Sequence, residues 1–252
     1  MIEINKIYNM DCLEGLKQLK DNSIDCIWTD PPFNINYIYD EYKDSLSEDE
    51  YFKWCEKWLI ESYRVIKSSG SIYIKIWSHK SYELQSIMRS IGFKFQNQII
   101  WKRKSQAGYK NKLLGGYEVI LFFTKSKDNY IFNPEAVLRK TEFLARWDGT
   151  KIYKGRLNDL WDDIKPVTAG NLKHPEGIYI KGTGKKEHPA QHPEELVRRC
   201  ILFSTYENHL ILDLFMGSGT TASVCVKNNR KYIGFDISNN YVNIAKERLF
   251  NI

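Results

Sequence analysis

The stretch LILDLFMGSGTTASVCVKNNRKYIGFD, residues 210–236, decides the fold. It begins with an apolar run, continues through a turn that holds Gly217 and Gly219, and then suits a short helix. A second apolar run, residues 231–235, ends in Asp236. Strand, glycine-rich turn, helix and strand in this order predict one unit of a parallel sheet that is covered by helices.

The turn and the acid after it predict a site for a nucleoside-containing cofactor. Glycine lets the backbone approach a ligand closely, and an acid at the end of the next strand can accept hydrogen bonds from ribose hydroxyls. Residues 217–222 also match the dinucleotide pattern G-x-G-x-x-A. That fold needs a second mononucleotide half, whereas the 30 residues after Ala222 suffice for one more strand and helix. A nicotinamide oxidoreductase is therefore the less favoured alternative.

A second motif, Asp30-Pro31-Pro32-Phe33, follows an apolar run at residues 24–29 that predicts a buried strand. The two prolines fix two φ angles and remove two backbone donors, and each pushes the residue before it toward extended geometry. The resulting stiff turn presents a carboxylate, backbone carbonyls and an aromatic ring together. Such a set suits a flat heteroaromatic amine; the alternative is an ordinary turn at the end of a strand.

The rest of the chain alternates strands and helices. We predict seven strands, which are residues 3–8, 24–29, 71–77, 95–101 and 117–124, the run that begins at Leu210, and residues 231–235. One strand, residues 117–124, is expected to be antiparallel in a mostly parallel α/β sheet with helices on both faces. Asp11, Asp30, Asp213 and Asp236 then fall at strand carboxyl ends, where such sheets bind ligands.

The basic residues are unevenly distributed. The chain has a formal net charge of +6, but residues 102–156 hold 13 Lys/Arg against 5 Asp/Glu, so this block carries +8 and the remainder −2. Such a block predicts contact with a polyanion; the alternative is a solvated lysine-rich face. The residues expected to contact nucleic acid are Lys102, Arg103, Lys104, Lys110, Lys112, Arg139, Lys140, Arg146 and Arg156.

Other features argue against several classes of protein. The five cysteines are scattered and form no C-x-x-C pair, which predicts buried thiols rather than a disulfide framework. A proline follows both His188 and His192, so we expect no metal site there. No run approaches the roughly 18 apolar residues of a membrane helix, and the amino terminus lacks a secretory apolar region. A cytoplasmic location is therefore expected.

Four segments together carry a family resemblance: Asp30-Pro31-Pro32-Phe33, residues 213–221, Asp236, and His188-Pro189-Ala190-Gln191-His192-Pro193. Through them the chain resembles the S-adenosylmethionine-dependent amino-methyltransferases of DNA, which act on adenine N6 or cytosine N4. The tetrapeptide precedes the glycines, which is the order of the beta class. The resemblance implies a Rossmann-like class I methyltransferase fold, S-adenosyl-L-methionine as cofactor and double-stranded DNA as partner.

The resemblance also implies a division of the chain and a set of cofactor residues. Residues 1–125 and 188–252 would form the catalytic and cofactor-binding domain, and residues 126–187 an inserted target-recognition region. The expected cofactor-binding residues are Asp11, Cys12, His188, Gln191, Asp213, Phe215, Gly217, Ser218, Gly219, Thr220, Thr221, Asp236 and Ile237. Asp11, Thr220 and Thr221 are also compatible with capping the helices that follow them.

Three residues depart from the family's common pattern. Phe33 stands where tyrosine is commoner, so stacking is kept and a hydroxyl contact is lost. His192 stands where lysine is usual, so a charge contact there is not assumed. Leu214 replaces a frequent proline, with no expected effect.

The expected catalytic residues are Asp30, Pro31, Pro32 and Phe33. An exocyclic amine is a poor nucleophile because its lone pair is delocalised into the ring. The Asp30 carboxylate and the Pro31 carbonyl would accept its two hydrogens and stabilise the developing positive charge, while Phe33 stacks on a base that has left the duplex. This assignment requires Asp30 to face the pocket floored by Gly217, with its oxygens available.

Aspartate at the first tetrapeptide position favours adenine N6 by resemblance. Physical chemistry alone does not separate adenine from cytosine, so a cytosine-N4 enzyme remains an alternative. A non-catalytic nucleic-acid-binding partner with this fold is another, and RNA is an alternative substrate. A cognate restriction endonuclease and a homodimer are further partners that the resemblance leaves open.

Overall fold

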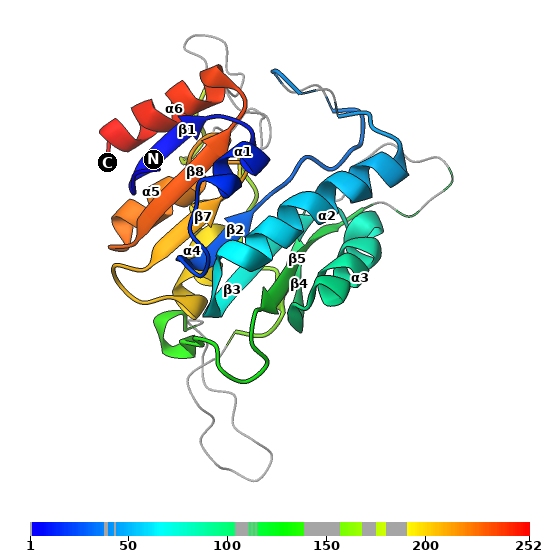
Figure 1. The fold of residues 1–252 in the computed structure, drawn as a ribbon. Helices are drawn as coiled ribbons and strands as arrows, with labels where there is room; N and C mark the ends of the chain where they lie inside the picture. Colours follow the sequence, from blue (N-terminus) through cyan, green and yellow to red (C-terminus); the bar gives the residue numbers. More distant parts are fainter. Residues whose placement is uncertain are drawn as a thin grey trace.

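The computed structural model describes residues 2–37, 40–42, 44–103, 111, 113, 115–138, 157–167, 175–179 and 191–252. They form one eight-stranded sheet with the order β1-β8-β7-β2-β3-β5-β4-β6 (Figure 1). The strands are β1 (Lys6–Asn9), β2 (Ile24–Thr29), β3 (Ile66–Ile76), β4 (Lys94–Lys102), β5 (Tyr117–Thr124), β6 (Leu160–Trp161), β7 (Leu210–Asp213) and β8 (Lys231–Asp236). Of these strands, β5 runs antiparallel to β3 and β4, whereas the other pairings are parallel.

The predicted fold class is confirmed, including the antiparallel β5, but two details differ. An eighth strand, β6, lies at the sheet edge, where Leu160 and Trp161 pair with β4. Two residues are too few to show a period, so this strand could not be predicted from the sequence. Strand β3 begins at Ile66 rather than at residue 71, because Ile66 pairs with Ile24 before the register shifts.

The helices lie in two layers, one on each face of the sheet (Figure 1). One layer holds α1 (Cys12–Lys17), α2 (Glu48–Val65) and α3 (Ser81–Ile91); the other holds α4 (Glu194–Ser204), α5 (Thr220–Lys227) and α6 (Asn239–Phe250). Two short 3-10 helices, η1 (Ser78–Lys80) and η2 (Pro134–Ala136), lie in connections. Helix α2 begins with the capping box that Ser47 and Glu50 predict.

Apolar side chains fill the space between the sheet and both helix layers. Trp58 and Leu59 of α2 are fully buried against one face, and Cys200 and Ile201 of α4 against the other. Full burial of Leu59 or of Ile201 stabilises the fold by about 1.5–3 kcal/mol each. All five cysteines are buried and free, as predicted. Within the described ranges, no helix is both long enough and apolar enough to cross a membrane.

The strand order places distant parts of the chain side by side. Cys26 and Ile27 of β2 pair with Ile211 and Leu212 of β7, and β7 in turn pairs with β8. On its other side β2 pairs with β3. The tetrapeptide after β2, the glycine turn after β7 and the acid at the end of β8 therefore meet at one edge of the sheet, although about 180 residues separate the first two along the chain.

Candidate active site at the carboxyl edge of the sheet

A pocket opens where β1, β2, β7 and β8 end, and it brings together most of the predicted site residues. Its lining includes Asp11, Cys12, Asp30, Pro32, Gln191, Asp213, Phe215, Gly217, Ser218, Thr220, Thr221, Asp236 and Ile237. Pro31, Phe33 and Gly219 adjoin this lining without being part of it, and His188 lies outside the described residues. The strand-end acids therefore converge on one pocket, as the strand arrangement predicts.

The glycine turn is tight for two reasons. Gly217 and Gly219 have φ angles of 50° and 77°, in the left-handed region that side chains disfavour. A Cβ on Gly219 would also lie 2.8 Å from the Cβ of Ala245 in α6. Because α5 begins directly at Thr220, the turn presents the first backbone N–H groups of that helix, which have no intrahelical acceptor.

Asp236 anchors this turn from the end of β8. Its carboxylate accepts hydrogen bonds from the backbone N–H of Gly217 at 2.8 Å and of Ser238 at 2.9 Å. Burial raises the pKa of Asp236, and the two hydrogen bonds oppose that rise. Each carboxylate oxygen has two acceptor positions, so the same side chain can hold the turn and still accept from a diol in the pocket.

The acid at the end of β7 is more deeply buried. Asp213 accepts from the backbone N–H of Phe215 at 3.1 Å and from the hydroxyl of Thr221 at 2.5 Å. Burial raises its pKa to about 7, although these two hydrogen bonds oppose the rise. The hydroxyl hydrogen of Thr221 is used inside the protein, so what Thr221 offers an anionic ligand is its backbone N–H. Phe215 packs against Trp54 and closes one wall of the pocket.

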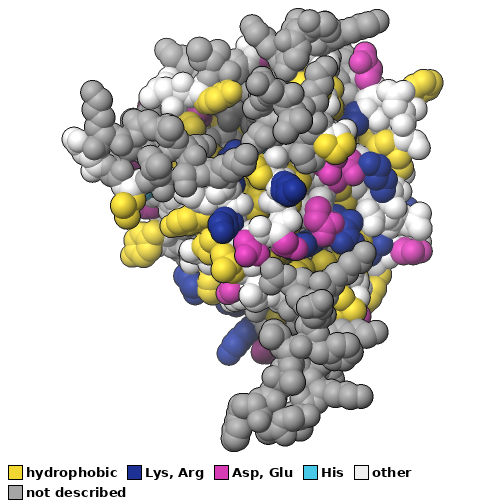
Figure 2. Space-filling model, turned by 180° about the vertical axis from the view of Figure 1, so that it is seen from behind, with side chains coloured by type: hydrophobic (Ala, Val, Ile, Leu, Met, Phe, Trp, Pro, Cys, Tyr) yellow, Lys and Arg dark blue, Asp and Glu magenta, His cyan; other side chains and the backbone are white. Residues whose placement is uncertain are grey.

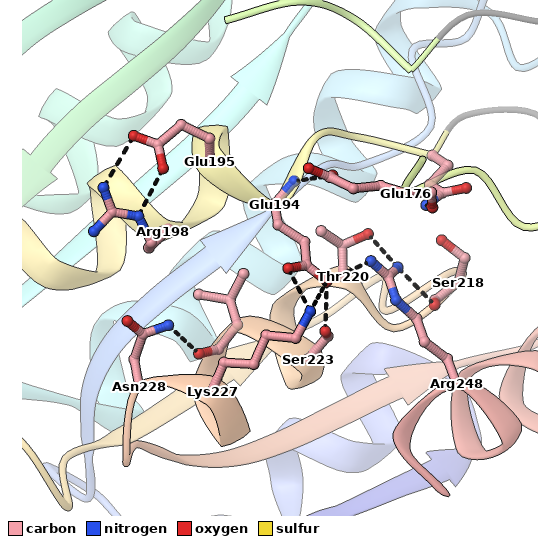
Figure 3. Close-up of polar contacts among 12 residues, drawn as sticks. Glu176, Glu194, Glu195, Arg198, Ser218, Thr220, Ser223, Lys227, Asn228 and Arg248 are labelled. Carbon is pink, nitrogen blue, oxygen red and sulfur yellow. Dashed lines mark hydrogen bonds and ion pairs between the residues drawn. The ribbon is translucent and has the colours of Figure 1, made fainter. Parts of the chain in front are cut away.

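A polar network ties the starts of α4 and α5 to α6 (Figure 3). Arg248 donates to the Thr220 hydroxyl at 2.9 Å and to the Ser218 carbonyl at 3.3 Å, and it pairs with Glu194 at 2.8 Å. Lys227 also donates to Glu194, at 2.8 Å and 2.9 Å. Burial opposes ionisation of Glu194, but its hydrogen bonds and the charge of Arg248 lower its pKa overall. The network holds the glycine turn at Ser218 and Thr220, whereas Asp236 holds it at Gly217.

Asp11 caps a helix and also lines the pocket. One carboxylate oxygen accepts from the backbone N–H of Leu13 at 2.8 Å and of Glu14 at 3.4 Å, which caps α1. The side chain also lines the pocket, beside the buried Cys12. Across the pocket, Gln191 is fixed by the backbone of the segment before α4: its oxygen accepts from Ile178 at 3.0 Å.

Asp30 lines the same pocket as Gly217, as its expected role requires, but both of its oxygens already have partners. Oδ1 accepts from Nζ of Lys75 at 3.1 Å, and Oδ2 contacts Nε2 of His192. Asp30 therefore lies at the pocket as expected, but the expectation that its oxygens are free is wrong. The side chain is 17% exposed, and each oxygen retains a second acceptor position, so Asp30 can accept one more hydrogen from a group in the pocket.

These partners hold Asp30 ionised. Burial would raise the pKa of Asp30, but the charges and hydrogen bonds of Lys75 and His192 outweigh it and lower the pKa to about 2. Burial also lowers the pKa of His192, with Lys75 adding to the effect and Asp30 opposing it. Near neutral pH the group thus consists of a carboxylate, an ammonium and a neutral imidazole.

The rest of the tetrapeptide is fixed by α2 and β3. The Tyr51 hydroxyl donates to the carbonyl of Pro32 at 2.9 Å, whereas no donor within the described ranges reaches the carbonyl of Pro31. Nζ of Lys75 lies 4.4 Å from the centroid of the Phe33 ring, within the range of a cation–π contact. Within the described ranges the Pro31 carbonyl thus keeps its acceptor capacity, and Lys75 covers one face of the Phe33 ring.

Two residues that contact Asp30, Lys75 and His192, were not among the predicted site residues. A signal for Lys75 existed: it interrupts the apolar run Ile72-Tyr73-Ile74 just before Ile76, and a lysine in a buried strand is rarely without a partner. His192 belongs to the segment 188–193 that carries the family resemblance, but it was not named as a contact of Asp30. The pocket lining also includes Tyr42, Trp54, Ser238 and Tyr241. No motif in the sequence marked these four residues as part of a site.

Little of the basic block falls in the described part of the chain. Lys102 is exposed at the end of β4, and Arg103 pairs with Glu118. The other predicted contacts, Lys104, Lys110, Lys112, Arg139, Lys140, Arg146 and Arg156, lie outside the described residues. On the face drawn in Figure 2, the described basic and acidic side chains lie next to one another. Nine of the 13 basic residues of the block are among those not described, so the described surface does not test its role.

The fold and the pocket define a class I S-adenosylmethionine-dependent methyltransferase. The family model described as DNA methylase, of the N6/N4 type, matches residues 24–247. The chain belongs to this family.

Individual relatives agree with this assignment. Type II methyltransferase M.HpaI of Haemophilus parainfluenzae is 34% identical over 240 residues, which cover 95% of this chain and 72% of that protein. DNA adenine methyltransferase YhdJ of Escherichia coli is 30% identical over 249 residues, 98% of this chain and 83% of that protein. The chain is thus similar to methyltransferases of restriction–modification systems along nearly its whole length.

Solved structures show the same fold. PvuII DNA methyltransferase, which is cytosine-N4-specific, superposes with a TM-score of 0.74 at 21% identity and covers 96% of this chain and 85% of its own. The M1.HpyAVI–SAM complex gives a TM-score of 0.65 at 25% identity, over 97% and 98% of the two chains. Proteins named for adenine and for cytosine-N4 are both among the similar ones.

The residues present suit S-adenosylmethionine, the family's cofactor. Asp236 retains acceptor positions for a ribose diol, and the start of α5 presents N–H groups for the carboxylate of the methionine part. Phe215 and Ile237 give the pocket apolar walls. Asp30, ionised at the rim, complements the positive charge of a sulfonium.

Proposed function

We propose that this protein is a site-specific DNA methyltransferase that modifies N6 of adenine. The observation that carries the proposal is Asp30, a carboxylate kept ionised at the rim of the cofactor pocket. Aspartate at this position favours adenine among similar enzymes, and one relative bears the name DNA adenine methyltransferase. Cytosine N4 is the second candidate, because the PvuII enzyme shares the fold.

Asp30 and Pro31 act on the exocyclic amine. Each accepts one of its hydrogens, which favours a pyramidal nitrogen and stabilises the positive charge that develops there. Phe33 stacks on the base through the ring face away from Lys75. The bound cofactor supplies an activated methyl group. The target nucleotide leaves the duplex to reach these groups, at a cost of a few kcal/mol.

The glycine turn and its supports hold the cofactor. Asp236 accepts from the ribose hydroxyls, and the N–H groups at the start of α5 bind the methionine carboxylate. Asp236 fixes the turn at Gly217 and Arg248 fixes it at Thr220, so the backbone of the turn is preorganised before the cofactor binds. Residues 1–125 and 188–252 would form this catalytic domain, with residues 126–187 reading the DNA sequence and a restriction endonuclease as the cognate partner.

Product analysis tests the choice of base. The purified protein is incubated with methyl-labelled cofactor and unmodified DNA of varied sequence, and the DNA is then digested to nucleosides. We expect the label in N6-methyl-2′-deoxyadenosine and in no other nucleoside, and single-molecule sequencing of the same DNA gives the recognition site. Label in N4-methylcytosine would overturn the adenine assignment and leave the methyltransferase assignment intact.

Binding of DNA should depend steeply on salt because basic side chains displace counterions from phosphates. Replacing exposed Lys102 by alanine is expected to weaken binding and to reduce the slope of log K against log salt by about 1. Lys127 is also exposed but lies beyond the opposite end of β5, so Lys127→Ala is the matched control. Fluorescence anisotropy over a range of salt concentrations measures the DNA affinity and the salt slope of each variant. Equal slopes for the two variants would show that Lys102 does not contact the DNA.

A further inference from the structure

Four charged side chains of alternating sign cross the sheet next to the pocket. Asp30 follows β2, Lys75 lies in β3, Glu118 in β5 and Arg103 directly after β4, and these strands are neighbours in the order β2-β3-β5-β4. The register pairs Thr29 with Ile74, so Lys75 lies across from Asp30. We call these four residues the charge row.

Lys75 is the central member of the charge row and is almost fully buried, with its side chain 3% exposed. Its Nζ lies 3.1 Å from Oδ1 of Asp30, 2.7 Å from Oε2 of Glu118 and 4.4 Å from the centroid of the Phe33 ring. One ammonium group therefore contacts both the first and the last residue of the tetrapeptide. Arg103 contacts the other oxygen of Glu118. Glu118 therefore holds Lys75 from one side, while Lys75 contacts Asp30 and Phe33.

Stability alone gives a weak reason for this arrangement. Burying ion pairs costs desolvation, and well-packed apolar residues in their place are often neutral or stabilising. Here the ion pair lies at the one point where the orientation of a carboxylate and of a ring decides the reaction geometry. A group that contacts both can fix their relative position before substrate binds.

We propose that Lys75 is a positioning residue, which holds the Asp30 carboxylate and the Phe33 ring in the arrangement that receives the target base. This inference rests on the proposed function. Lys75 covers one face of the Phe33 ring, so the base stacks on the other. It also occupies one acceptor position of Asp30 Oδ1, which leaves the remaining positions for the amine.

Removing Lys75 has a consequence that loss of packing alone would not produce. The charged and titratable groups that face Asp30 are Lys75 from β3, His192 before α4, Arg103 after β4 and Asp213 at the end of β7. Without Lys75, Asp30 loses the largest of the influences that lower its pKa, and His192, whose own pKa Lys75 lowers, is the remaining partner; the pKa of Asp30 therefore rises. Since the carboxylate is the working form, activity should fall as pH decreases, in a range where the wild-type protein keeps Asp30 ionised.

The test uses the double variant Lys75→Gln/Glu118→Gln, because it leaves no unpaired charge at Glu118, with Glu118→Gln alone as the matched control. We expect the double variant to be about 10²-fold slower than wild type in single-turnover methyl transfer near pH 6. A rise in pH should restore part of that rate, whereas Glu118→Gln keeps the wild-type pH profile. Thermal unfolding and cofactor titration confirm that both variants are folded and bind cofactor.

A second readout needs neither cofactor nor DNA. With ¹³C-labelled aspartate, the Asp30 carboxyl resonance is assigned as the one missing from Asp30→Asn, and its titration is followed by NMR. We expect the pKa of Asp30 to be measurably higher in the double variant than in wild type, where the contact with Lys75 helps to hold it at about 2. An unchanged pH profile together with an unchanged titration overturns the role of Lys75. Wild-type protein that transfers no methyl group to either base would instead overturn the proposed function.

Discussion

Replacing Asp30 by alanine is expected to lower the rate of methyl transfer by about 10²- to 10³-fold. The variant loses an acceptor for the target amine and the negative charge that stabilises the developing cation. Asp30→Asn should be nearly as slow, because its amide nitrogen donates and its remaining oxygen carries no charge. Single-turnover assays at saturating cofactor and DNA isolate this step.

The control for the Asp30 variants is Asp128→Ala, which removes a carboxylate from an exposed turn after β5. It should retain the wild-type rate. Cofactor affinity of Asp30→Asn, measured by calorimetry, should change far less than its rate. Retention of more than about a tenth of the wild-type rate by Asp30→Asn would contradict the assigned role. The negative charge would then lower the activation free energy by less than about 1.4 kcal/mol.

Replacing Asp236 by alanine should act on the cofactor instead. The carboxylate accepts from the backbone N–H groups of Gly217 and Ser238 and is expected to accept from the ribose. Hydrogen bonds to a charged group contribute about 1.5–3 kcal/mol each, so loss of the ribose contact alone should weaken cofactor binding by about 10- to 100-fold. Calorimetric titration measures this, and the rate at saturating cofactor should stay within severalfold of wild type.

Asp236→Asn separates the two functions of this side chain. The amide retains one oxygen with two acceptor positions, so it can accept from one backbone N–H and one ribose hydroxyl, but not from both backbone N–H groups and the whole diol. We expect an affinity between those of wild type and of Asp236→Ala. Wild-type affinity in both variants would show that Asp236 supports the turn without contacting the cofactor.

Local sequence was sufficient to place much of the site. Asp11, Asp30, Asp213 and Asp236 were expected at strand carboxyl ends, and they line one pocket because parallel strands end at the same edge. The glycine turn was equally visible, since Gly217 and Gly219 adopt backbone angles that few other residues tolerate.

What the sequence did not reveal depends on which strands are neighbours. Lys75 contacts Asp30 because β3 lies beside β2, and His192 reaches it from 162 residues further along the chain. Thr221 was expected among the cofactor-binding residues, but its hydroxyl donates to Asp213. The short β6 depends entirely on the edge of β4, so its two residues carry no pattern of their own.

The neighbouring positions of β2 and β7 make the linear order of the two motifs irrelevant to the chemistry. β1 pairs with β8, and α6 packs against β1 (Figure 1), so the amino and carboxyl ends lie close together. A circularly permuted gene that joins these ends and opens the chain before α4 would encode the glycine turn before the tetrapeptide. The same strands would still touch, and connectivity would have changed without altering the site.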